Sequence, residues 1–176
     1  DKLREIDLNK VDDSYKEVVK KYIINEEEVQ KGKIKFDDKI LHRSKLIRYF
    51  NNEIDQKKAQ KDFLRIYKKI KKNRKYFFSA KDLALVESLA NDGFEIPKEL
   101  NYKEISKKYS VPTNLLKLGE GKESAFLTLK LVEIIGEDEA YNLDPETIYF
   151  ITHLLNENNL TKIRNDILIS ALPLRT

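Results

Sequence analysis

Hydrophobic side chains recur along this chain at intervals of three, four and seven residues, the spacing that places them on one face of a helix. No stretch shows a sustained alternation of apolar and polar residues, so the sequence predicts no secure strand. The pattern predicts eight or nine helices joined by short connections. The expected helices begin near Ser14, Asp37, Gln56, Ser79, Tyr102, Asn114, Ser124, Pro145 and Thr161.

Local signals mark several of these helix ends. The stretch Ser79-Ala80-Lys81-Asp82 resembles a capping box with Asp in place of Glu or Gln. Asp144 followed by Pro145 is a strong helix start, because Asp caps the helix and Pro suits its first position. Gly93 suits the left-handed position after a helix end, and Gly136 is expected to end another helix. Thr161 is expected to cap the last helix.

Short connections between successive helices imply antiparallel neighbours. We therefore expect an all-α fold of stacked antiparallel helical hairpins, with an α-solenoid or tetratricopeptide-like superhelix as one form of it. Residues 1–13 form a polar N-terminal segment, and residues 14–176 form the helical domain. Within that domain we expect two sub-parts, a basic one over 14–78 and an acidic one over 79–176.

A faint internal similarity links residues 84–94 with residues 149–160. Both pass from a helical apolar pattern to Asn, an acid, and then Gly or Asn. Such similarity is typical of helical repeats, although the tetratricopeptide consensus is not met. Two helix ends that share one kind of terminator explain it more simply.

Charge is distributed unevenly along the 176 residues, of which 36% are charged. The net charge is +4, yet residues 57–76 hold ten basic side chains and one acid, Asp62. Without the +9 of this segment, the rest of the chain would carry −5. Residues 101–176 hold nine basic and eleven acidic side chains. Polarised charge of this kind draws an anionic partner toward one face.

The basic segment has three interpretations. It is an ordinary amphipathic helix with Phe63, Ile66, Tyr67 and Ile70 in the core and lysines in water, or it contacts RNA, DNA or acidic lipid headgroups, or it docks to an acidic protein. The candidate residues for binding an anionic partner are Lys61, Arg65, Lys68, Lys69, Lys71, Lys72, Arg74 and Lys75.

Three aromatic residues, Tyr76, Phe77 and Phe78, follow the basic segment directly. Such rings could stack on nucleic-acid bases. We expect them instead in the core, at the junction between the two sub-parts.

Catalytic and metal chemistry find little support. Cysteine is absent, which excludes disulfides, thiolate nucleophiles and Cys-ligated metals. His42 and His153 are far apart and match no metal-binding spacing, and we expect His153 to be a partly buried structural residue. No Gly-x-Ser-x-Gly elbow occurs, although a Ser-His-Asp set can still assemble in three dimensions. We expect no enzyme activity, no cofactor and no metal.

Three further motifs are weak. The loop 118–124 lacks the first Gly of a phosphate loop, where Leu116 stands, and has Glu123 where Ser or Thr holds Mg²⁺. The acids of 133–146 are expected to form a solvated rim that complements a helix dipole, rather than an acid–base pair. Residues 103–118 resemble a helix-turn-helix, but they lie in the acidic half of the chain, which disfavours DNA binding.

No apolar run approaches the roughly 20 residues that span a bilayer, and the sequence assigns no compartment. Met is absent even at position 1, and an apolar run over 167–174 almost reaches the last residue. We therefore expect a fragment or a processed part of a longer chain.

The function we expect is that of a non-catalytic helical scaffold or protein–protein interaction module. The alternative is a nucleic-acid-binding protein that uses the basic helix 57–76. A protein partner is expected first, with nucleic acid or an acidic membrane surface as the alternatives.

Overall fold

The computed structural model describes residues 34–109, 124–136, 140–172 and 174–175. The chain divides into two units, and Phe36–Leu174 contains all the helices described below. Ile34, Lys35 and Arg175 belong to the other unit. Two-residue strands, β1 (Ile34–Lys35) and β2 (Leu174–Arg175), pair in a minimal sheet. Strands this short leave no alternating pattern, which explains why the sequence predicted none.

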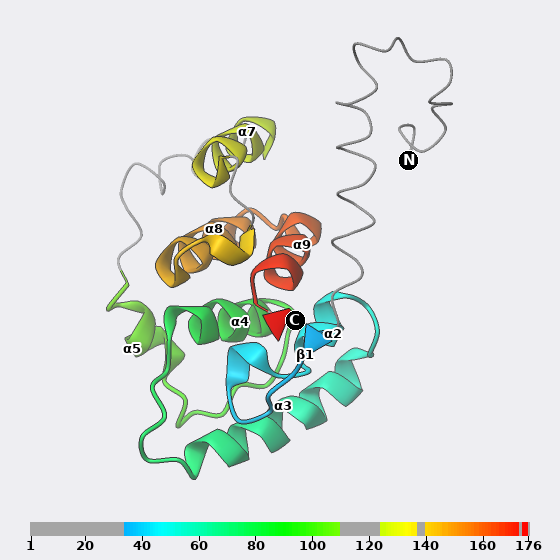
Figure 1. Ribbon diagram of the computed structural model, residues 1–176, viewed down its shortest axis with the longest axis vertical. Coiled ribbons are helices and arrows are strands. Elements are labelled where there is room, and N and C mark those ends of the chain that lie inside the picture. The colour runs from blue at the N-terminus through cyan, green and yellow to red at the C-terminus, as the bar shows by residue number, and fades with distance from the viewer. Residues whose placement is uncertain (1–33, 110–123, 137–139, 173, 176) are drawn as a thin grey trace. The chain divides into compact units, whose positions relative to one another are not determined.

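The helices confirm an all-α fold over the described residues, which contain seven α-helices and two 3₁₀ turns. Two of the expected helices, those near Ser14 and Asn114, lie outside the described residues, as do residues 118–123 of the rejected phosphate loop. In chain order the elements are η3 (Leu41–Arg43), α2 (Ile47–Phe50), α3 (Gln56–Lys71), α4 (Ala80–Asn91), α5 (Tyr102–Ser106), α7 (Ser124–Ile135), η4 (Ala140–Asn142), α8 (Pro145–Glu157) and α9 (Thr161–Ala171) (Figure 1).

Several predicted helix ends are confirmed by their hydrogen bonds. Ser79 Oγ accepts the Asp82 N–H at 3.2 Å, and Asp82 Oδ2 accepts the Ser79 N–H at 3.0 Å, which completes the capping box of α4. Asp144 caps α8 by accepting two backbone N–H groups, with Pro at the first helical position. Gly93 has φ +84° after α4, and Gly136 has φ +63° after α7.

Two predicted helix boundaries are wrong. The single helix expected from Asp37 is divided into η3 and α2, because the Ser44 hydroxyl donates to the Leu41 carbonyl and the Ser44 backbone is extended. Thr161 was expected to cap α9 but is its first residue. The capping position is Leu160, which makes no side-chain capping bond.

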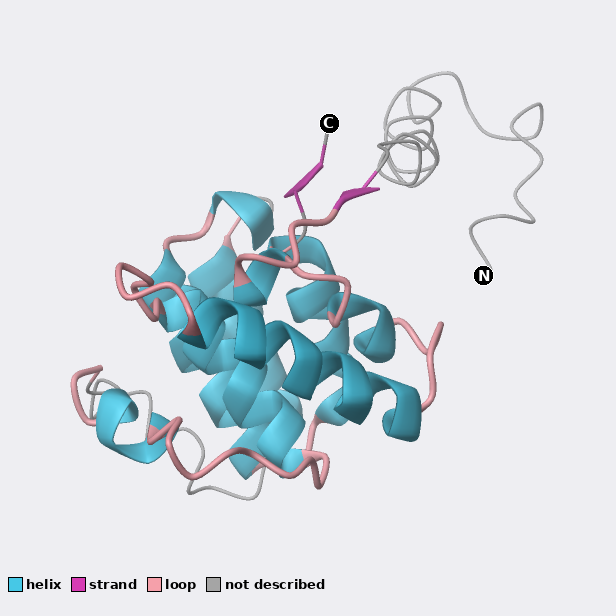
Figure 2. Cartoon of the chain, turned by 90° about the horizontal axis from the view of Figure 1, so that it is seen from below, coloured by secondary structure: helices cyan, strands magenta, loops and turns pink. Residues whose placement is uncertain are grey.

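Helix α4 lies at the centre of the packing. It packs against α8, which packs in turn against α9, and α9 also contacts α2 (Figure 1). Figure 2 shows that the described part of the chain is built mainly of helices joined by loops. Leu83, Leu85 and Leu89 of α4 are fully buried in the larger of two hydrophobic clusters, to which α3 also contributes. The smaller cluster joins α7, α8 and α9. Because α3 enters the core by one face, its opposite face is left to solvent.

Candidate functional site: the basic face of α3

Helix α3 is oriented by its apolar residues. Asp55 caps its N-terminus by accepting the Lys58 N–H at 2.8 Å. The apolar face is buried, as the sequence predicted, and consists of Ala59, Phe63, Ile66, Tyr67 and Ile70. A helix of 16 residues is about 24 Å long. Burial of one face fixes the rotation of the helix and directs its cations outward along that length.

The helix ends at Lys71, earlier than the predicted basic segment. Asn73 forms a turn there, since its carbonyl accepts the Tyr76 N–H at 2.9 Å and its side chain accepts the Lys75 N–H at 3.1 Å. Arg74 and Lys75 therefore lie on a turn that follows the helix. We call the eight candidate cations the basic face, and every one of them is exposed: Lys61, Arg65, Lys68, Lys69, Lys71, Lys72, Arg74 and Lys75.

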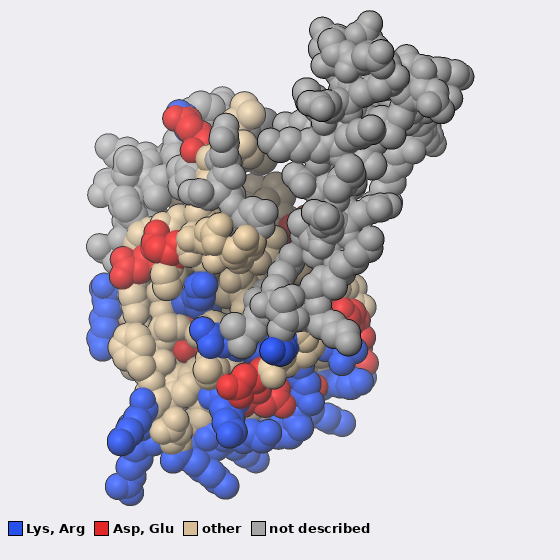
Figure 3. Space-filling view, in the orientation of Figure 1, with Lys and Arg blue, Asp and Glu red and all other residues tan. Residues whose placement is uncertain are grey.

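Figure 3 shows Lys and Arg side chains gathered along the lower edge of the view, where Figure 1 places α3. Acidic side chains are interspersed among them. Asp38 lies 3.6 Å from Arg65 Nη2 and 3.9 Å from Lys69 Nζ, and Asp62 lies 2.9 Å from Arg65 Nη2. Among the described residues, the other six cations of the basic face have no ion pair. Exposed pairs of this kind are weak, so the surface keeps a strong positive charge.

An open hollow of about 420 Å³ lies at the C-terminal end of α3 and is lined by Lys39, Lys69, Lys72 and Asn73. Lys39 comes from the segment before η3, roughly thirty residues earlier in the chain. The sequence could not associate it with the basic segment. The fold thus adds a cation to the end of the basic face.

The three aromatic residues after the basic segment have different environments. The Tyr76 hydroxyl donates to Asp82 Oδ2 at 3.0 Å and accepts the Leu41 N–H at 2.9 Å. Phe78 is partly buried against the core. Phe77, in contrast, is 77% exposed. The expectation that all three belong to the core is therefore wrong for Phe77.

A Ser-His-Asp set does assemble, but its geometry is that of a helix cap. The fully buried Asp82 accepts from the backbone of His42 and from its ring, with Nδ1 2.7 Å from Asp82 Oδ1. Ser79 Oγ lies 3.4 Å from the same nitrogen. In a catalytic triad, Asp and Ser use opposite ring nitrogens. Here both residues contact Nδ1, so the geometry is not that of a catalytic triad. The three residues instead stabilise the N-terminus of α4.

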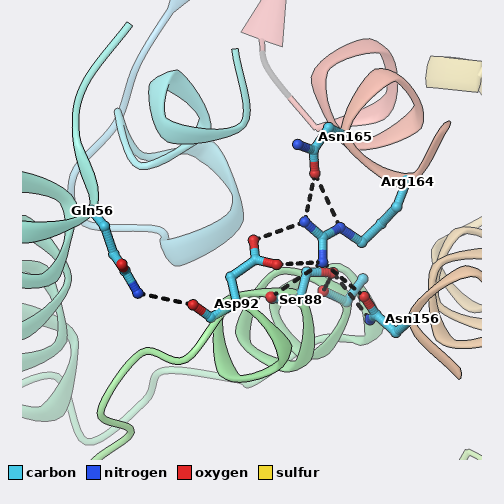
Figure 4. Close-up of polar contacts among 7 residues, drawn as sticks. Gln56, Ser88, Asp92, Asn156, Arg164 and Asn165 are labelled. Carbon is cyan, nitrogen blue, oxygen red and sulfur yellow. Dashed lines mark hydrogen bonds and ion pairs between the residues drawn. The ribbon is translucent and has the colours of Figure 1, made fainter. Parts of the chain in front are cut away.

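A second polar cluster surrounds Arg164, which is 1% exposed (Figure 4). Its Nη1 donates to Asp92 Oδ1 at 2.9 Å and to Asn156 Oδ1 at 3.0 Å, and its Nη2 donates to Asp92 Oδ2 at 2.7 Å. Both Nε and Nη2 also donate to Asn165 Oδ1. The guanidinium is used within the fold, where it ties α4, α8 and α9 together. This cluster was not predicted, and its one signal in the sequence is an Arg among the apolar positions of its helix.

His153 is partly buried, as predicted. Its Nδ1 lies 3.0 Å from Glu87 Oε1, and this hydrogen bond raises the pKa of His153, against the opposing effect of burial. Across the ranges that the structure describes, no group of three or more His, Cys, Asp or Glu side chains could hold a metal ion.

Comparisons with protein-family models, with curated proteins and with solved structures gave no match to this chain. Within the described part of the chain, no helix combines the length and the apolar character needed to cross a membrane.

Proposed function

We propose that this chain is a non-catalytic interaction module that binds an anionic partner through the basic face of α3. One observation carries the proposal: six of its eight exposed cations have no ion pair among the described residues. Cations without acidic partners produce a positive potential that attracts polyanions and accelerates their association.

The burial of Phe63 and Ile66 supports this proposal, since both are fully buried and hold α3 against the core. The backbone that carries the cations is therefore ordered before any partner arrives, which lowers the entropic cost of binding. The two clusters of polar side chains, around Asp82 and around Arg164, support a non-catalytic role, because their hydrogen bonds stabilise the fold. Asp82 and Arg164 use their hydrogen bonds within the fold.

Heparin affinity tests the proposal. The wild-type chain is expected to bind at low salt and to elute at moderate salt, because the interaction is electrostatic. A variant with Glu at Lys68, Lys69, Lys71 and Lys72 should lose retention. The matched control places Glu at four other exposed lysines, which gives the same change in net charge: Lys98, Lys103, Lys107 and Lys108.

The control variant should retain most of the binding. The proposal is wrong if the wild-type chain does not bind at low salt, or if the two variants lose retention equally. Lys side chains near the C-terminus of a helix interact favourably with the helix dipole, and Glu at these positions would not. A variant with Gln at the same four positions should therefore also be compared. Circular dichroism of each variant checks that the fold is intact.

A second candidate function is that of a scaffold for a protein partner, and one observation on α7 favours it. Leu129 is 69% exposed and Val132 is 59% exposed, and residues three apart are neighbours on one helix face. Leu127 and Leu131 pack into the smaller core cluster. An exposed apolar patch is typical of contact surfaces. The stacked hairpins predicted from the sequence, with their tetratricopeptide-like form, would give such a scaffold its shape.

The scaffold function predicts that a Leu129→Lys, Val132→Lys variant loses defined proteins that the wild-type chain retains in a pull-down. The charge-reversed α3 variant should keep them. If the α7 variant retains the same proteins as the wild-type chain, this second function is wrong.

A further inference from the structure

We infer, on the basis of the proposed function, that the anionic partner is a single-stranded nucleic acid whose phosphates lie along the basic face and whose bases stack on Phe77. Phe77 is an exposed aromatic ring that closely follows the run of cations in the chain.

Phe77 is held outward by its neighbours. Tyr76 is fixed by hydrogen bonds to Asp82 and to the backbone of Leu41, and Phe78 packs against the core. The backbone on both sides is thus anchored, while the ring between them is 77% exposed. Among the described aromatic residues, no ring contact involves Phe77. The ring is presented to solvent on an ordered segment, and its faces are available.

Cations lie within reach of this ring along the chain. Arg74 and Lys75 precede it and are exposed. Asn73, which lines the cationic hollow, is four residues from Phe77. Four residues span at most about 14 Å, so a single short strand can place phosphates at the hollow and a base at the ring. A positively charged track with an aromatic platform is the arrangement by which proteins bind single strands without reading sequence.

Other anionic partners would not depend on stacking against Phe77. Duplex DNA keeps the faces of its bases stacked inside, so Phe77 could reach one only after a base is unpaired. An acidic protein segment or a lipid surface would use the ring as an apolar contact, for which an aliphatic side chain serves as well. A single-stranded nucleic acid therefore differs from these partners in requiring a flat aromatic face at position 77.

Fluorescence anisotropy with a labelled oligothymidylate at low salt tests the inference. Phe77→Leu keeps the apolar bulk and removes the aromatic face, so it should weaken binding by about 5- to 100-fold, given the usual energy of one stacked base. Phe77→Trp should bind at least as tightly as the wild-type chain. Tyr141→Leu is the control, because Tyr141 is an exposed aromatic residue outside the basic segment.

Heparin has no bases, so its binding separates failure of the inference from failure of the proposed function. Phe77→Leu should leave heparin affinity unchanged. If heparin binds but oligothymidylate binding is unaffected by Phe77→Leu, the inference is wrong and the proposed function stands. If neither ligand binds, both are wrong.

Two further results would overturn the inference in favour of other partners. One is tighter binding to the matching duplex than to the single strand. The other is binding to vesicles that contain phosphatidylserine at concentrations where oligothymidylate does not bind, with Phe77→Leu as effective as the wild-type chain.

Discussion

The guanidinium of Arg164 makes two parallel hydrogen bonds to the carboxylate of Asp92, at 2.9 and 2.7 Å. The pair joins α9 to the end of α4 across 72 residues of sequence. Arg164 also lies over the Phe50 ring, with 5.5 Å between its Cζ and the ring centroid. A buried charge is tolerated when it is paired and its remaining donors are used. This pair holds α4 and α9 together.

Arg164→Ala should lower the free energy of unfolding by about 3–5 kcal/mol, because it leaves the Asp92 carboxylate without its partner. Urea unfolding followed by circular dichroism measures the change. The control is Arg65→Ala, which removes the exposed pair with Asp62 and should cost about 1 kcal/mol or less. Similar losses for the two variants would contradict the structural role assigned to Arg164.

Asp82→Ala should destabilise the chain by about 2–4 kcal/mol, since it removes one half of the α4 capping box and leaves partly buried donors of His42 and Tyr76 without an acceptor. Asp144→Ala provides the comparison. Asp144 also caps a helix, but it is exposed, so its loss should cost only about 1 kcal/mol. If the two variants lose equal stability in thermal or urea unfolding, burial of the Asp82 cluster does not contribute to the stability of the chain.

The stability of the chain should depend on pH through His153. The hydrogen bond to Glu87 raises the folded-state pKa of His153 above its ordinary value of 6.5, and the charge of Glu157 acts in the same direction. A raised pKa means that the stabilisation is complete below pH 6.5 and is lost as the pH rises through the folded-state pKa. The stability contributed by His153 should therefore fall on going from acidic to alkaline pH.

The measurement is the difference in unfolding free energy between the wild-type chain and His153→Gln across that pH range. Taking a difference removes the contributions of the other titrating groups. The difference should be largest at the acidic end and should shrink as the pH rises. A difference that does not vary with pH, or that grows with it, would contradict the assigned pairing.

Features set by neighbours in sequence were predictable. The Ser79–Asp82 capping box and the Asp144–Pro145 helix start depend on groups two or three residues apart. The buried face of α3 followed from the spacing of its apolar residues, and this placed the five candidate cations within the helix on its exposed side. The location of the candidate site was therefore available from the sequence.

Features set by distant contacts were not predictable. The only sequence signal of the Arg164–Asp92 pair is one Arg among the apolar positions of its helix. Lys39 joins the hollow through the fold alone. Three consecutive aromatic residues look alike in sequence. In the fold, Tyr76 is hydrogen-bonded to Asp82 and Phe78 packs against the core, whereas Phe77 is exposed.

The central claim is that the basic face of α3 binds an anionic partner, and an NMR titration tests it most directly. Uniformly ¹⁵N-labelled chain would be titrated at low salt with a short heparin oligosaccharide while the amide resonances are followed. The account predicts that the largest shifts fall between Lys68 and Lys75, that added salt reverses them, and that the amides of α5 remain unchanged. Shifts spread evenly over the surface, or centred on another helix, would contradict it.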